Sequence, residues 1–148
     1  MINVSKIKKI IKTKFGFLCS DLGARLVKEE IEPFGIFLTY TTDKAGLRVS
    51  FEPREGGVFV MVFPLHDQEI PQYKNWYDVI DLFHAKGVKF VEQNISNYNN
   101  PDPKELEEAL EHFANNVRIH ARSFLEGDFS INEELELIVK KRKSSEKR

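Results

Sequence analysis

The 148-residue chain has very little cysteine. Cys19 is its only cysteine, so an internal disulfide and a cysteine-based metal cluster are both excluded, and a small buried side chain is the expected role of this thiol. The sequence also lacks an apolar run of about 20 residues and anything that resembles a signal peptide. These absences indicate neither export nor membrane insertion, and we expect a cytoplasmic protein.

An excess of charge of one sign is missing too. The 22 Lys and Arg residues nearly balance 23 Asp and Glu residues, which leaves a net charge of −1, so the overall charge indicates no nucleic-acid or membrane partner. What the chain does contain is 41% hydrophobic residues, including twelve Phe. This composition and length predict a single packed domain over residues 1–142, followed by a disordered basic tail at 143–148 that has no apolar anchor.

The segment at 45–65, AGLRVSFEPREGGVFVMVFPL, has the strongest strand pattern. Two runs rich in β-branched and aromatic residues flank a turn that contains Gly56 and Gly57, which predicts a β-hairpin. We place the tip at Glu55 and Gly56, whereas a three-residue loop would shift the strand pairing by one residue.

With this tip, Phe51 opposes Val60 and Val49 opposes Val62. Alternation along the strands then separates an apolar face from a mixed one. The apolar face comprises Leu47, Val49, Phe51, Val60 and Val62, and the mixed face comprises Arg48, Ser50, Glu52, Phe59, Met61 and Phe63.

Periodicity predicts the remaining elements. Strands are expected at about 23–31 and 35–42, and helices at 4–15, 75–85 and 102–126, with a last helix opening near Ser130 and a polar connector at 88–101. The helix at 4–15 is basic and amphipathic, and its apolar stripe is expected to pack on the sheet rather than on a membrane or nucleic acid. The fold class is therefore α+β: an antiparallel meander of about four strands with an N-terminal helix and C-terminal helices packed on it.

The mixed face of the hairpin is the first candidate functional surface. Its apolar side chains are core if a helix covers them, and a binding patch if they remain exposed. The second strand of the hairpin is apolar on both faces, and both cannot be covered if every helix packs on the same side of the sheet. We therefore expect either that the N-terminal helix crosses to this side or that the patch contacts a second protein chain. The candidate partner-binding residues are Arg48, Glu52, Phe59, Met61 and Phe63.

The second candidate lies along one border of the long helix, where helical spacing aligns His112, Asn116, His120 and Ser123. Such a border suits a ligand-binding or catalytic cleft, because histidine exchanges protons near neutral pH. The alternative is that these side chains hydrogen-bond loop backbone at the edge of the core. No cofactor is expected, and no metal site either, because no set of three or four ligands is held together by the sequence pattern.

The strands ending in GLRVSFEPREGGVFVMVFPL, followed by WYDVIDL and by a long helix closing with FLEGDFS, resemble small uncharacterised bacterial α+β proteins, some of them similar to immunity proteins of polymorphic toxin systems. The resemblance covers about residues 34–136. It implies a non-catalytic role in which the protein binds and blocks a partner toxin, and it assigns no site residue.

The sequence thus favours a non-catalytic cytoplasmic binding protein whose partner is another protein or a second copy of itself. The alternative is a small enzyme or ligand-binding protein that uses the cleft bordered by His112, Asn116 and His120.

Overall fold

The computed structural model describes residues 3–146 and contains one antiparallel sheet with the strand order β1-β2-β3-β4-β5. The strands are β1 Arg25–Glu32, β2 Gly35–Thr41, β3 Ala45–Glu52, β4 Gly57–Pro64 and β5 Tyr77–Asp78. The α+β meander is therefore confirmed, with five strands in place of about four. The additional strand, β5, spans two residues, which is too short to show a strand period in the sequence.

The central hairpin keeps its predicted faces but not its predicted register. Val49 pairs with Val60, and Phe51 pairs with Val58, so each residue of β3 pairs with a residue of β4 two positions earlier than expected, and the tip moves one residue toward the N-terminus. The cause is the turn: residues 53–55 form a short 3₁₀ helix, and Gly56 follows it with φ 90°. A shift of two residues preserves the side-chain alternation, and all five residues of the predicted apolar face are buried.

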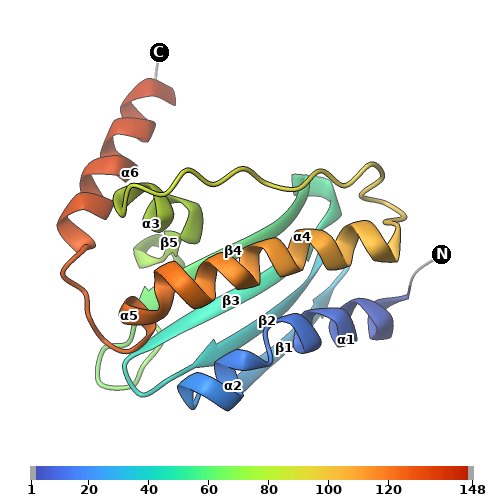
Figure 1. The fold of residues 1–148 in the computed structure, drawn as a ribbon, viewed down its shortest axis with the longest axis horizontal. Coiled ribbons are helices and arrows are strands. Elements are labelled where there is room, and N and C mark those ends of the chain that lie inside the picture. The colour runs from blue at the N-terminus through green and yellow to red at the C-terminus, as the bar shows by residue number, and fades with distance from the viewer. Residues whose placement is uncertain (1–2, 147–148) are drawn as a thin grey trace.

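The helices that cover the sheet lie on one side of it (Figure 1). They are α1 Val4–Lys14, α2 Phe17–Leu22 and α4 Pro103–Asn116, which continues through a π-helical segment labelled η3, Val117–Ala121, into α5 Arg122–Leu125. Helices α1 and α4 run side by side across the sheet (Figure 1). The N-terminal helix therefore does not cross to the opposite side. Cys19 on α2 is exposed, so its predicted burial is wrong.

The core lies between these helices and the sheet because each helix presents one apolar stripe. The stripe of the long helix is buried along its whole length, and it includes Leu106, Leu110, Phe113, Val117, Ala121 and Phe124. The lysines of α1 flank this core, where the Nζ atoms of Lys8 and Lys12 lie 3.3 and 2.7 Å from an oxygen of Glu29 on β1.

Side-chain caps place the helix starts. Asp102 accepts a hydrogen bond from the amide of Lys104 at 2.9 Å, as expected for the start of α4. Helix α3 spans Val79–Ala85 and begins after Asp78, which accepts from the amide of Ile80. The predicted start at Asn75 is therefore wrong: residues 73–75 form a separate 3₁₀ turn, η2.

The C-terminal helix α6, Asn132–Glu146, stands beyond α3, away from the sheet (Figure 1). It includes residues 143–146 of the segment predicted to be disordered, because its run of Lys, Arg and Glu favours continuation of a helix; the rest of that predicted tail, residues 147–148, lies outside the described residues. Within residues 3–146, no helix has the length and apolar character required to cross a bilayer.

Candidate protein-binding face of the sheet

The side of the sheet opposite the helices carries the partner-binding residues predicted from the sequence. We call it the outer face. Strand pairing places its side chains in transverse rows, one of which joins Phe37, Ser50 and Phe59 while the next joins Thr39, Arg48 and Met61. The alternation predicted for β3 and β4 therefore brings all five candidates to one side of the sheet.

One end of the outer face is covered by the loop that follows β4. Trp76 stacks on Phe63 with ring centroids 4.3 Å apart, and the indole Nε1 donates a hydrogen bond to the carbonyl oxygen of Pro71 at 2.9 Å. Phe63 is fully buried as a result. It acts as a support for the loop, whereas Phe59 and Met61 remain half-buried.

Arg48 occupies the middle of the outer face among three aromatic rings. Its guanidinium carbon lies 4.8 Å from the ring centroid of Phe37, 5.2 Å from that of Tyr73 and 4.9 Å from that of Trp76. These distances are typical of cation–π contacts. Its Nε atom is buried without a hydrogen-bond partner, and among residues 3–146 no carboxylate lies within 4.0 Å of its guanidinium. The rings therefore hold this cation in place without an ion pair.

Two adjoining hollows open beside Arg48. The smaller, of about 300 Å³, is lined by Glu30, Glu32, Phe34, Phe37, Arg48, Glu52 and Tyr73. The larger, of about 590 Å³, is lined by Phe34, Glu52, Arg54, Glu55, Phe59 and Tyr73. Because both share Phe34, Glu52 and Tyr73, they form one continuous depression on the outer face.

The edge of the hollow carries two carboxylates that face glycines across the strands. Glu32 pairs with Gly35, and Glu52 pairs with Gly57. The space above Gly35 is filled by its neighbours, because a Cβ atom there would lie 3.1 Å from Cγ of Glu52 and 3.1 Å from Cε2 of Phe37. The hydroxyl of Ser50 donates to Glu52 at 2.6 Å and orients this carboxylate at the edge of the hollow.

Two aromatic residues complete the walls. Phe34, in the turn between β1 and β2, is 48% exposed and packs edge-on against Phe37 at 5.6 Å, and Tyr73 is 58% exposed. Alternation along the hairpin could not locate either residue, because both lie in non-repetitive segments. The only sequence signal was the clustering of aromatic residues near Trp76.

The second group of candidates, along the long helix, contacts the connector that precedes this helix. The Nε2 atom of His112 lies 2.8 Å from the carbonyl oxygen of Val91, and its ring stacks on Phe90 at 4.6 Å. Asn116 donates to the carbonyl oxygen of His112 at 2.9 Å. The contact of His112 fits the alternative in which the border residues hydrogen-bond loop backbone, whereas Asn116 bonds backbone of its own helix.

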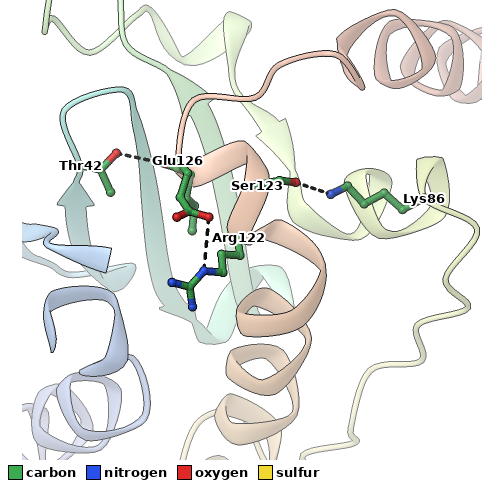
Figure 2. Close-up of polar contacts among 6 residues, drawn as sticks. Thr42, Lys86, Arg122, Ser123 and Glu126 are labelled. Carbon is green, nitrogen blue, oxygen red and sulfur yellow. Dashed lines mark hydrogen bonds and ion pairs between the residues drawn. The ribbon is translucent and has the colours of Figure 1, made fainter. Parts of the chain in front are cut away.

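The other two border residues lie further along, in the π-helical and α5 segments. His120 meets Phe83 of α3 at a ring separation of 6.1 Å. Ser123 accepts a hydrogen bond from the Nζ of Lys86 at 2.7 Å (Figure 2). The four side chains thus line up along the helix, and each contacts α3 or the segment after it, or another residue of the helix itself.

The described residues contain no group of three or more His, Cys, Asp or Glu side chains arranged to hold a metal ion. Comparison of the chain with protein-family models, with curated proteins and with solved structures finds no match.

Proposed function

We propose that this chain is a non-catalytic binding protein of the cytoplasm, with a role of the immunity type, and that the outer face of its sheet contacts a partner protein. The observation that supports this most directly is the depression beside Arg48, which lies on the side of the sheet opposite α1, α2 and α4. Exposed aromatic side chains at its walls and charged side chains at its rim match the composition of protein interfaces, in which aromatic residues and Arg contribute most of the binding energy.

The test is the effect of outer-face substitutions on partner binding. Phe59→Ser combined with Met61→Ser should weaken the complex with a partner co-purified from the native cell by about tenfold or more, as loss of a central apolar contact predicts. The dissociation constant is measured with both proteins purified. The matched control, Val91→Ser with Ile119→Ser, removes exposed apolar groups outside the sheet and should leave the affinity unchanged.

Thermal melting of each variant separates binding from folding. If the Phe59 and Met61 changes unfold the protein, these residues are core. If both double variants bind as the unchanged protein does, the partner surface lies elsewhere and the proposal is wrong.

A second candidate function is ligand binding along the helix border that carries His112, Asn116 and His120. It is favoured by the π-helical segment at 117–121, since such segments often occur at functional sites. A metabolite extract from the native cell should then shift the imidazole NMR signals of His112 and His120. The signals of His66 and His84, which are exposed elsewhere, should stay in place.

A further inference from the structure

We infer that the depression on the outer face is a cation cage, which receives a lysine or arginine side chain of the partner protein. The inference rests on the proposed function and adds to it the chemistry of the partner. Its basis is the combination of exposed aromatic rings with a surplus of carboxylates around one opening.

The charges around the opening favour a cation. Four carboxylates line the two hollows, against the guanidinium groups of Arg48 and Arg54. The carboxylates are those of Glu30, Glu32, Glu52 and Glu55. Lys28 lies one row further along β1 on the same side but does not line either hollow. An acidic partner segment would meet net repulsion here, whereas a basic one would meet net attraction.

Within residues 3–146, none of these four carboxylates forms an ion pair within 4.0 Å. Arg48 is held by rings rather than by an ion pair, and Arg54 forms no ion pair within 4.0 Å in the described part of the chain. Glu32 and Glu55 are exposed, so they attract a cation before it loses its own hydration. An incoming ammonium or guanidinium would therefore be the first close ionic partner of these groups.

The aromatic walls add a second attraction. Phe34 and Tyr73 line both hollows and are exposed, and Tyr73 already contacts one guanidinium, that of Arg48, at 5.2 Å. A cation within about 6 Å of such rings is attracted by their negative faces. Glu32 and Glu52 line the smaller hollow together with these two rings, so a side chain that enters it meets carboxylates and aromatic faces together.

Trp76 provides the measurement, because it is the only tryptophan and its ring lies 4.9 Å from the Arg48 guanidinium. The probe is a capped peptide of alternating glycine and arginine, added to the full chain at low salt. We expect a saturable change in Trp76 fluorescence, and the binding that it reports should weaken as the salt concentration rises. Capped peptides that carry glutamate or serine in place of arginine should produce no saturable change.

Two matched triple variants identify the groups responsible. Changing Glu30, Glu32 and Glu52 to Gln should weaken binding of the arginine peptide by about tenfold, since each exposed ion pair contributes about twofold to the affinity. The control changes Glu107, Glu108 and Glu133 to Gln, which removes the same charge from exposed positions on α4 and α6. It should bind as the unchanged protein does.

Equal loss in the two triple variants, or binding of the serine peptide as strong as that of the arginine peptide, would overturn the cation cage. The proposed function fails separately. If partner affinity depends on Phe59 and Met61 but not on the three glutamates, the outer face binds the partner without a cage. If the arginine peptide binds through the glutamates while neither these glutamates nor Phe59 and Met61 affect partner affinity, the hollow binds a cation but receives no side chain of the partner, whose site is elsewhere.

Discussion

Gly46 lies directly beneath Phe63, its cross-strand partner on the outer face. A Cβ atom at position 46 would lie 2.3 Å from Cε2 of the Phe63 ring, and Trp76 presses on the ring from the other side. The absent side chain therefore lets the ring lie against the strand and support the covering loop.

Gly46→Ala should destabilise the protein by about 1–3 kcal/mol, the usual cost of forcing extra volume into a packed site. Denaturant unfolding gives the free energy, and a shift of Trp76 emission should accompany the change. Adding Phe63→Leu should recover part of the loss, with a coupling energy above about 0.5 kcal/mol. Wild-type stability and emission in Gly46→Ala would show that the ring is free to move.

The π-helical segment offers a matched pair of core and surface positions. Val117 is fully buried, whereas Ile119, two residues later, is 70% exposed. Val117→Asp buries a charge without a partner and should cost several kcal/mol, on the order of the whole stability of a domain. Ile119→Asp should change stability by less than about 0.5 kcal/mol. Similar melting temperatures for the two variants would contradict this orientation of the segment.

Burial explains which parts of the fold were predictable. The stripe that contains Phe113 and Val117, and the faces that contain Val49 and Met61, follow from periodicity, because a buried face must repeat with its element. The hairpin register did not follow, since it depends on how residues 53–56 turn, and this local geometry leaves the two faces unchanged.

The candidate site was predictable only in part for the same reason. Alternation placed Arg48, Glu52 and Phe59 together on one face, and the structure keeps them there. The rings around Arg48 come largely from Tyr73 and Trp76, in a loop without a period. Their position depends on tertiary contacts such as the stacking on Phe63, which no spacing in the sequence encodes.

The docking of α6 depends on a contact with α3. Nη1 of Arg142 lies 2.5 Å from Oδ2 of Asp81, which is buried, and Tyr77 donates a hydrogen bond to Glu136. Burial, with the bond to Glu136, raises the pKa of Tyr77 to about 12, so its hydroxyl keeps its proton, and the bond to Glu136, to a higher pH than an exposed tyrosine would.

Arg142→Gln should cost about 1–3 kcal/mol, because it leaves a buried carboxylate without its cation, although the half-exposed arginine lowers the cost from that of a fully buried pair. Lys141→Gln, an exposed neighbour, should change stability by less than about 0.5 kcal/mol. Deletion of residues 143–148 should do likewise, because it retains Arg142 and the residues at 143–145 are exposed. Unfolding free energies test all three, and an Arg142→Gln variant as stable as the deletion would show that the ion pair does not hold α6.

Asp78 makes the stability of α3 depend on pH. Burial raises the pKa of its carboxyl above the ordinary value, and the hydrogen bond from the amide of Ile80 opposes this only in part. The folded state therefore binds the proton more tightly than the unfolded state does. Stability from this group is complete below the unfolded pKa and is lost as pH rises through the raised folded pKa.

Asp78→Asn should consequently stabilise the protein at pH 7, by about 0.5–2 kcal/mol as for other improved caps, because the amide avoids burying a charge and still caps the helix. The gain should vanish at pH values below the unfolded pKa, where the Asp78 carboxyl is protonated in both the folded and the unfolded protein. The control is Asp102→Asn at the exposed cap of α4, which should give no comparable gain at pH 7. Urea unfolding at the two pH values measures the difference, and a gain that persists in acid would show that desolvation of the Asp78 charge is not its cause.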